Sequence, residues 1–411
     1  MPVATHLIAA DAEPLGSKSR RVLYAAGINH ALHDGYTDLI YVLLPIWQQE
    51  FALGYATLAL LRTLYSGTLA ALQVPSTLLA RSLGARNVLV LGTLVSGAGY
   101  AFAGASGGLL ALCAALALGG AGSSTQHPLA SSLIARTYGR SARGPLGTYN
   151  FAGDVGKAIV PPLIGYLLTV WHWRSALWLI AGLGFVIALV VAYLLPTDRS
   201  SQHRMRVDAT QAVQPEGHHQ KGRLGFGLLV AIGVLDNSAR PAFLLYLPFL
   251  LQEKGAALTT VGLALSSVFV GGALGKAACG WLGDRVGVTR TVLFTETGTA
   301  VTVLAAIVLP LGSVLFLLPL IGVMLNGTSS VLYGTVPELA PGGRVEHAFA
   351  LFYTFSLGGS ALASPLLYGQ LGDAFGPHWA ATASAATALA VIPLMLALSP
   401  RLSKSTVPSK T

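Results

Sequence analysis

Residues 41–50 read YVLLPIWQQE, and residues 245–254 read LYLPFLLQEK. Both stretches combine an apolar run with a proline and a glutamate, and Pro45 and Pro248 occupy matching positions at an offset of 203 residues. A second match has an offset of 204, and it pairs Tyr149 with Tyr353, Phe151 with Phe355, Pro161 with Pro365 and Gly165 with Gly369. Such a constant offset indicates a duplicated unit. Parallel six-helix repeats are typical of one large transporter architecture, with its substrate site between the repeats.

The composition indicates a membrane protein. Of the 411 residues, 53% are hydrophobic and only 10% are charged, whereas soluble domains carry about 25% charged residues. No polar segment is long enough to form a catalytic domain. The sequence also lacks a phosphate-binding loop, an HExxH or GxSxG motif and a zinc pattern, so we expect no enzyme activity, no ATP-driven transport, no cofactor and no metal site.

Twelve apolar runs have the length of about 20 residues that spans a bilayer as a helix. They begin near Val22, Tyr55, Val88, Leu109, Gly144, Arg174, Leu224, Leu258, Thr291, Gly312, Glu346 and His378. We therefore expect an all-α membrane protein with two six-helix bundles related by a pseudo-two-fold axis. The N-terminal bundle covers residues 1–195, a polar cytoplasmic linker covers 196–223, and the C-terminal bundle covers 224–411.

Positive charge predicts the orientation of the chain. Most Lys and Arg residues lie in the termini and in every second gap between the runs, whereas the alternate gaps contain only Arg174 and Lys254. By the positive-inside rule, both termini are cytoplasmic. We expect a multi-pass protein of a bacterial inner membrane. The net charge of +9 reflects this topology and not a nucleic-acid partner, so the expected partners are lipid, protons and a small-molecule substrate. We expect a monomer.

The stretch GWLGDRVGVTR, residues 280–290, carries a G-x-x-x-D-R-x-G pattern. It resembles the signature of the major facilitator superfamily, and the resemblance implies that this cytoplasmic loop latches the two halves together. The corresponding N-terminal segment, LLARSLGAR at residues 78–86, keeps the glycine and the arginines but has lost the acid. The residues of the expected latch are Gly280, Gly283, Asp284, Arg285 and Gly287.

Two further segments resemble the fosmidomycin-resistance group of bacterial efflux proteins within that superfamily. The first, HALHDGYTDLIYVLLPIWQQEF at residues 30–51, matches an H-x-x-x-D pattern followed by P-x-x-Q-x-E-F. The second, GAGSSTQHPLASSLIAR at residues 120–136, matches a G-x-G-S-S-x-x-H-P pattern and includes Gln126 and His127. The resemblance implies an efflux transporter.

A polar stripe runs along the first predicted helix. His30, Asp34 and Asp38 are spaced at i, i+4 and i+8 and share one helix face, with His33 at its edge. Ionisable groups in a membrane are costly and are candidates for function. A partly dehydrated carboxyl such as Asp34 is suited to load and release a proton near neutral pH, and histidine titrates in the same range. The alternative is that the stripe pairs with Arg62 and the fourth helix only to hold the bundle together.

The fourth and fifth helices add further polar groups. His127 precedes Pro128, which frees a backbone carbonyl. His127 is then either part of a local site or a buried histidine that is hydrogen-bonded to the helix backbone. The fifth helix carries Asn150, Asp154 and Lys157. Asp154 is a further candidate for proton coupling, although Asp154 and Lys157 are also spaced to neutralise each other.

The seventh helix mirrors the first. At the offset of 203, His33 and Asp34 correspond to Asp236 and Asn237, and Thr37 corresponds to Arg240. Asp236 and Arg240 are expected to pair at rest, and an intramembrane arginine suits two-pronged binding of a carboxylate or phosphonate.

Four cations lie within predicted helices, namely Arg62, Lys157, Arg240 and Lys276, so the expected substrate is anionic or zwitterionic. Four acids, Asp34, Asp154, Asp236 and Glu296, balance these cations in number. The expected substrate-binding residues are Arg240, Asp236, Arg62, Gln126, His127, Asn150, Lys157, Tyr353 and Asn326.

The sequence therefore predicts a secondary transporter that exports a small polar compound in exchange for protons by alternating access. The proton-coupling candidates are Asp34, His30, His33 and Asp154. One alternative is proton-coupled or exchange-type uptake of a small organic anion. A second alternative is a membrane receptor that does not transport.

Overall fold

The computed structural model describes residues 16–196, 221–343 and 345–402. Most of the predicted linker, residues 197–220, lies outside this part of the chain. Apolar runs rich in Ala and Leu form helices throughout the described residues, because a helix satisfies every backbone polar group within its own segment. Nine of the described helical stretches are long and apolar enough to cross a membrane.

The N-bundle consists of the first eight helices. Their bounds are α1 (Ser17–Phe51), α2 (Tyr55–Ala71), α3 (Gln73–Leu83), α4 (Ala85–Ala105), α5 (Leu109–Ser123), α6 (Gln126–Tyr138), α7 (Arg143–Val170) and α8 (Trp173–Leu194), with a 3₁₀ turn, η1 (Gly139–Ser141), before α7. Helices α2 and α3 form one interrupted unit, and so do α5 and α6. The N-bundle thus contains six membrane-length units among its described residues.

The C-bundle consists of the remaining helices. Their bounds are α10 (Lys221–Glu253), α11 (Leu258–Val286), α12 (Val288–Val308), α13 (Leu311–Thr335), η2 (Pro341–Gly343), α14 (Val345–Ala363), η3 (Ser364–Gly369), α15 (Gln370–Phe375), α16 (Pro377–Leu398) and η4 (Ser399–Arg401). Helix α14 continues through the π-helical segment η3 into α15. The described residues of this bundle again form six units, and every predicted start lies close to an observed one.

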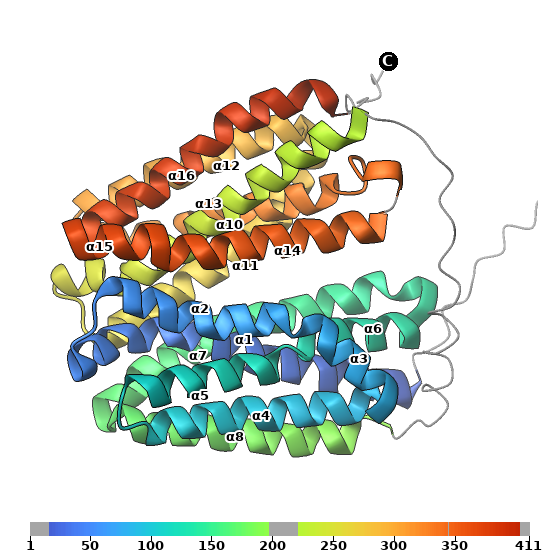
Figure 1. Ribbon diagram of the computed structural model, residues 1–411, viewed down its shortest axis with the longest axis vertical. Coiled ribbons are helices and arrows are strands. Elements are labelled where there is room, and N and C mark those ends of the chain that lie inside the picture. Colours follow the sequence, from blue (N-terminus) through green and yellow to red (C-terminus); the bar gives the residue numbers. More distant parts are fainter. Residues whose placement is uncertain (1–15, 197–220, 344, 403–411) are drawn as a thin grey trace, which may run out of the picture.

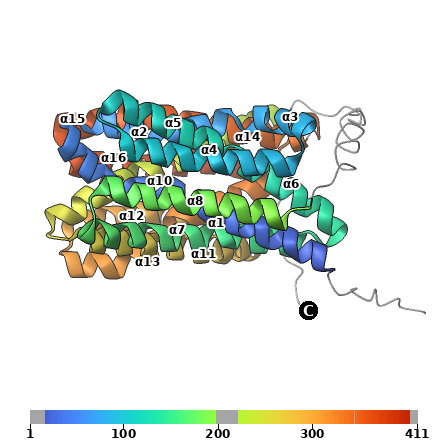
Figure 2. The ribbon, with the colours of Figure 1, turned by 90° about the horizontal axis from the view of Figure 1, so that it is seen from below.

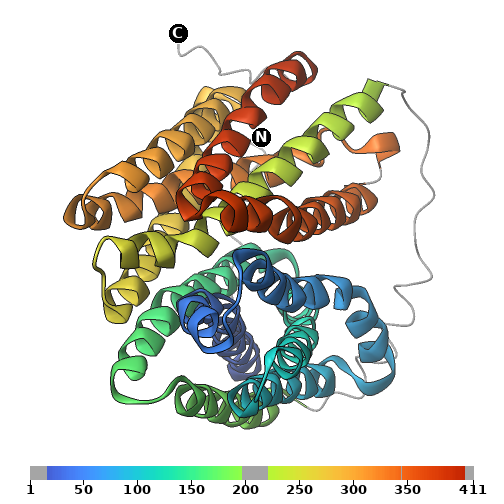
Figure 3. The same ribbon diagram turned by 60° about the vertical axis from the view of Figure 1, so that its left-hand side comes forward.

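The two bundles lie side by side. Figure 1 shows the N-bundle, coloured blue to green, beneath the C-bundle, coloured yellow-green to red. In Figure 2 the molecule is seen from below, and helices of both bundles run along the same direction. Figure 3 shows the two groups of helices as separate bundles. The bundles touch through α1, α2 and α7 on one side and α10, α11, α14, η3 and α15 on the other.

Backbone turns repeat at the offset found in the sequence. Gly84 (φ 85°) separates α3 from α4, and Gly287 (φ 90°) separates α11 from α12. Ala52 (φ 50°) follows α1, and Gly255 (φ 89°) follows α10. The partners of each pair are 203 residues apart, so the repeat is visible in the backbone conformation.

The bundles are fastened together at the end of the molecule that contains the α1–α2 turn, which we name the closed end. The carboxylate of Asp373 in α15 accepts hydrogen bonds from the backbone N–H groups of Tyr55 (2.5 Å) and Ala56 (3.1 Å), at the N-terminus of α2. An anion is favourable there because the first amides of a helix have no partner within it. Tyr55 also packs against Tyr246 and Phe249 of the C-bundle.

The expected latch lies at the opposite end. Asp284 is exposed and takes part in no ion pair among the described residues, and the guanidinium of Arg285 lies 4.5 Å from the centre of the Trp281 ring on its own helix. Gly283 accepts the backbone bond that ends α11 at Gly287. The segment therefore shapes the turn between α11 and α12, and Asp284 has no ion-pair partner within the described ranges.

Replacing Gly287 by alanine should destabilise the protein by about 1–3 kcal/mol, because only glycine adopts its φ and ψ of 90° and 153° without strain. Thermal unfolding midpoints in detergent would measure the effect. Gly280→Ala is the matched control, since its added Cβ meets no atom within 4 Å and its backbone is helical. We expect that control to be neutral or slightly stabilising. Equal effects of the two substitutions would contradict the assigned turn.

Candidate functional site

The polar stripe of α1 is buried inside the N-bundle against α6 and α7. His30, Asp34 and Asp38 are 3%, 7% and 5% exposed. Glycines allow this close packing, because a side chain at Gly156 of α7 would collide with the backbone of Ala31. The predicted face of α1 is thus placed where other helices surround it.

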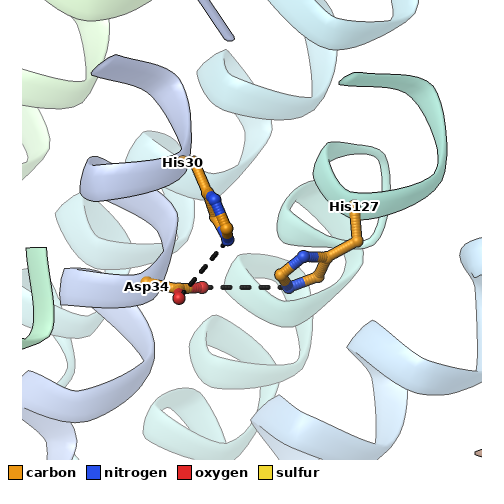
Figure 4. Close-up of side chains that lie close together, drawn as sticks. All are labelled: His30, Asp34 and His127. Carbon is orange, nitrogen blue, oxygen red and sulfur yellow. Dashed lines mark ion pairs between the residues drawn. The ribbon is translucent and has the colours of Figure 1, made fainter. Parts of the chain in front are cut away.

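Three side chains, from Lys157, His30 and His127, surround the Asp34 carboxylate. Figure 4 shows the two histidines. Lys157 of α7 places its Nζ 3.0 Å from Oδ2, His30 places its Nε2 3.4 Å from Oδ2, and His127 of α6 places its Nε2 3.8 Å from Oδ1. Asp34 is itself buried, whereas the His127 side chain is 42% exposed. Asp34 therefore lies close to a histidine that reaches the surface of the protein.

The orientation of His30 decides what this cluster can do. Its Nδ1 lies 2.8 Å from the carbonyl oxygen of Tyr149, and its ring stacks on the Tyr149 ring at 4.1 Å. A carbonyl only accepts, so Nδ1 must carry a proton, and in neutral histidine Nε2 is then an acceptor. That acceptor faces the Asp34 carboxylate, another acceptor. A hydrogen bond between these two groups would therefore need a proton on one of them.

His30, Asp34 and His127 also offer ligand atoms that lie within 4.8 Å of one another, close enough to hold a metal ion. The sequence analysis expected no metal site. The ammonium group of Lys157 already neutralises the same carboxylate. A cation in this place disfavours a divalent metal ion beside the carboxylate.

A second ion pair connects the two bundles. Asp154 of α7 accepts from Nζ of Lys276 in α11 at 2.7 Å, whereas Nζ of Lys157 is 3.9 Å from the same oxygen. The sequence analysis left two roles open for Asp154, proton coupling and neutralisation of Lys157. The structure contains the Asp154–Lys157 pair, but Lys157 lies closer to Asp34, and the closest partner of Asp154 comes from the other bundle. Sequence reasoning missed this partner, because spacing within one helix carries no information about another bundle.

Asp38 pairs with Arg62 of α2, with 3.7 Å between Oδ1 and Nη2. The Arg62 guanidinium lies over the Tyr41 ring at 4.9 Å, and its buried Nε and Nη1 make no hydrogen bond within the described structure.

In the C-bundle, Arg240 does not form the expected pair with Asp236, and no ion pair joins these two described residues. Nη1 of Arg240 instead donates to Oδ1 of Asn326 in α13 at 3.0 Å. The expectation failed because it considered only helix spacing, whereas the arginine side chain reaches a neighbouring helix. Two predicted substrate residues, Arg240 and Asn326, are thereby brought together.

The other predicted residues lie outside these clusters. Both ring nitrogens of His33 are hydrogen-bonded, to Ser123 (2.8 Å) and Thr93 (3.2 Å), so it fits a structural role. Gln126 is fully buried, and its Oε1 accepts from Asn29 at 2.5 Å.

Two more predicted contacts also stand apart. Asn150 is exposed, whereas its neighbour Tyr149 stacks on His30 of the Asp34 cluster. Tyr353 stacks on Tyr333 at 4.9 Å.

Comparison with known proteins gives a consistent match. The family model described as Major Facilitator Superfamily matches residues 27–208 and 226–411. The chain is 25% identical to the fosmidomycin resistance protein of Escherichia coli (strain K12) over 360 residues, 84% of this chain and 85% of that protein. It is 24% identical to monocarboxylate transporter 13 of Rattus norvegicus over 306 residues, 74% of this chain and 70% of that protein.

Solved structures share the fold. A bacterial homologue of the human lysosomal transporter Spinster, in an inward-facing and unoccupied conformation, has a TM-score of 0.71 at 14% identity, covering 93% of this chain and 96% of that one. A mutant of the nucleoside transporter NupG has a TM-score of 0.74 at 10% identity, covering 93% and 99%.

The Asp34–Lys157 contact should appear as a non-additive stability effect. Asp34→Asn and Lys157→Gln each leave a partly buried charge without its partner, so the double variant should be more stable than the sum of the single effects predicts, by about 0.5–3 kcal/mol. Thermal unfolding of the four proteins gives this coupling. Glu50→Gln with Lys157→Gln is the control cycle, and it should be additive because Glu50 pairs with Arg174. Additive behaviour of both cycles would contradict the ion pair.

Proposed function

The chain belongs to the Major Facilitator Superfamily, and we propose that it is a proton-coupled exporter that exchanges protons for a small anionic or zwitterionic compound. The observation that carries the proposal is the acceptor Nε2 of His30 facing the Asp34 carboxylate at 3.4 Å. A proton between these groups is favourable, and loss of that proton leaves Lys157 as the partner of Asp34.

The ion pairs offer a route from proton binding to movement of the bundles. When Asp34 takes up a proton, Lys157 loses its nearest anion, and the next carboxylate is that of Asp154 at 3.9 Å. That carboxylate holds Lys276 of the other bundle at 2.7 Å. Competition between the two lysines weakens the connection between α7 and α11. A proton thereby lowers the cost of separating the bundles, which is the differential affinity that coupling requires.

An anionic substrate acts on the same connection. If it pairs with Lys276, Asp154 is released from the C-bundle as well. Proton and substrate are then two alternative ways to release one bridge, and this arrangement favours exchange. The unpaired donors of Arg62 in the N-bundle and the guanidinium of Arg240 in the C-bundle supply further contacts for a carboxylate or phosphonate.

The orientation follows from the distribution of positive charge. The closed end contains the α1–α2 turn, which lacks Lys and Arg, so we assign this end to the periplasm and both termini to the cytoplasm. On this assignment, the contact between Asp373 and the N-terminus of α2 lies on the periplasmic side. The similarity to a protein named for fosmidomycin resistance favours export.

The similarity to a protein named monocarboxylate transporter 13 favours one other candidate, the uptake or exchange of an organic anion. Both candidates use the same proton site and differ in direction. Accumulation in whole cells separates them. If the chain exports, an uncoupler should raise the internal concentration of the substrate in expressing cells, and if it imports, the uncoupler should lower it.

Arg240 should contribute to binding of the anion. A thermal-shift screen of phosphonates, organic acids, amino-acid-like compounds and antibiotics on the purified protein identifies the ligand. We expect a compound that stabilises the wild-type protein and loses at least about tenfold in affinity with Arg240→Ala, the equivalent of 1.4 kcal/mol. Arg285→Ala, at the exposed end of α11, is the control and should bind normally. A ligand that binds equally to both variants would remove Arg240 from the site.

Asp34 should be required for transport driven by protons. In proteoliposomes, an imposed pH gradient should drive movement of the identified ligand by the wild-type protein, and Asp34→Asn should abolish the effect of the gradient. Exchange of labelled for unlabelled ligand without a gradient tests that the variant is still folded and binds. Unchanged pH-driven transport by Asp34→Asn would exclude Asp34 from coupling.

A further inference from the structure

The cations inside the predicted membrane helices differ in the charge of their partners. Nη1 of Arg240 in α10 donates to the side-chain oxygen of Asn326 in α13 at 3.0 Å, and Arg240 takes part in no ion pair within the described ranges. An amide oxygen accepts a hydrogen bond but carries no net charge. Arg240 is therefore held in place without being neutralised. The three other cations each have a carboxylate partner, which is Asp38 for Arg62 at 3.7 Å, Asp34 for Lys157 at 3.0 Å and Asp154 for Lys276 at 2.7 Å.

We infer that Asn326 is a positioning residue that fixes the Arg240 guanidinium and leaves its positive charge available to an anionic substrate. The sequence analysis expected Asn326 to contact the substrate itself. In the role inferred from the structure, Asn326 acts through Arg240, and an amide instead of a carboxylate at this position makes the site prefer anions. This role rests on the proposed binding of the anion by Arg240.

Contacts on both sides fix the orientation of the Asn326 amide. Its Nδ2 donates to the carbonyl oxygen of Gly322, one turn earlier in α13, at 3.0 Å. A backbone carbonyl only accepts and a guanidinium only donates, so the amide nitrogen must face Gly322 and the amide oxygen must face Arg240. The Asn326 side chain is buried and packs against Gly272 of α11, where an added Cβ would lie 2.7 Å from Nδ2. Asn326 is thus held in the orientation that presents an acceptor to Arg240.

Arg240 is better placed than Asn326 to meet a ligand. The arginine is partly exposed, whereas the amide is buried. A guanidinium has five N–H donors, so one hydrogen bond from Nη1 leaves others for a two-pronged contact with a carboxylate or phosphonate. Asp236, four residues earlier on α10, forms no ion pair with Arg240 in the described part of the chain. A substrate anion can therefore supply the counter-charge.

A carboxylate in place of the amide would change the charge of the site but hardly its shape. Aspartate has nearly the same size as asparagine, and at position 326 it would place a negative charge where Arg240 now finds a neutral oxygen. That charge would compete with a substrate anion for the same guanidinium and would repel the anion. The substitution Asn326→Asp therefore separates the charge of residue 326 from its packing.

Binding of methylphosphonate to the purified protein tests this role, with its neutral dimethyl ester as the comparison. Phosphorus nuclear magnetic resonance detects weak binding of both compounds. We expect the wild-type protein to prefer the anion, and Asn326→Asp to lose at least about tenfold in affinity for the anion but not for the ester. Thermal unfolding should show that this variant is still folded, whereas a merely structural defect would lower its unfolding midpoint and affect both compounds alike.

Asn87→Asp is the matched control. The side-chain oxygen of Asn87 also accepts from an arginine, Arg86, and its Nδ2 also donates to the carbonyl oxygen four residues earlier, that of Leu83. Asn87 lies on α4 in the other bundle, so its substitution adds the same charge away from Arg240. We expect Asn87→Asp to bind methylphosphonate as the wild-type protein does.

Asn326→Leu separates positioning from direct contact, because leucine is similar in size but offers no acceptor to Arg240. It should weaken binding of methylphosphonate by about three- to tenfold in the wild-type background, the loss of a hydrogen bond to a charged group. In an Arg240→Ala background it should have no further effect, because Asn326 acts through the arginine. If aspartate at position 326 prevents folding, this pair of variants still gives the answer.

The outcomes distinguish this role from the proposed function. Wild-type affinity for methylphosphonate in Asn326→Asp, together with a loss in Arg240→Ala, would overturn the role of Asn326 and keep Arg240 as the anion-binding residue. Equal losses from Asn326→Leu with and without Arg240 would mean that Asn326 contacts the anion directly, which also overturns it. A wild-type protein that does not prefer methylphosphonate to its ester would contradict both the anion site and the role of Asn326.

Discussion

The pairing of one buried carboxylate, that of Asp34, is the constraint on which the arrangement of the N-bundle depends. A charge inside a membrane protein must be neutralised or hydrogen-bonded. Asp34 meets this requirement with residues from two other helices, Lys157 of α7 and His127 of α6. Glycines 153 and 156 allow α7 to approach closely enough for the contact. Local packing and site chemistry are therefore set by the same contacts.

The connection between the bundles is both polar and apolar. Near Asp34 it consists of the Asp154–Lys276 ion pair. Towards the closed end, α7 and α11 come into backbone contact, and the Ser266 hydroxyl donates to the carbonyl of Ala158. An ion pair responds to protons and anions, whereas tight backbone packing does not. The interface between the bundles thus combines an ion pair, Asp154–Lys276, with close packing of α7 against α11.

Much of the fold could be predicted from sequence, because helix length and hydrophobicity are local properties and the duplication repeats them. The i, i+4, i+8 spacing also identified the stripe of α1. Partners across helices could not be predicted this way. The expected Asp236–Arg240 pair assumed a contact within one helix, whereas Arg240 reaches Asn326.

The central claim is that a proton on Asp34 changes how the bundles are held together. Pulsed electron paramagnetic resonance tests this claim by measuring the distance between two spin labels. The labels are attached at Ser82→Cys in α3 and Gly280→Cys in α11, in a variant in which Cys113 and Cys279 have been replaced. The account predicts a distance distribution that shifts with pH in this background and shifts far less when Asp34→Asn is added. The same pH-dependent shift with and without Asp34 would contradict it.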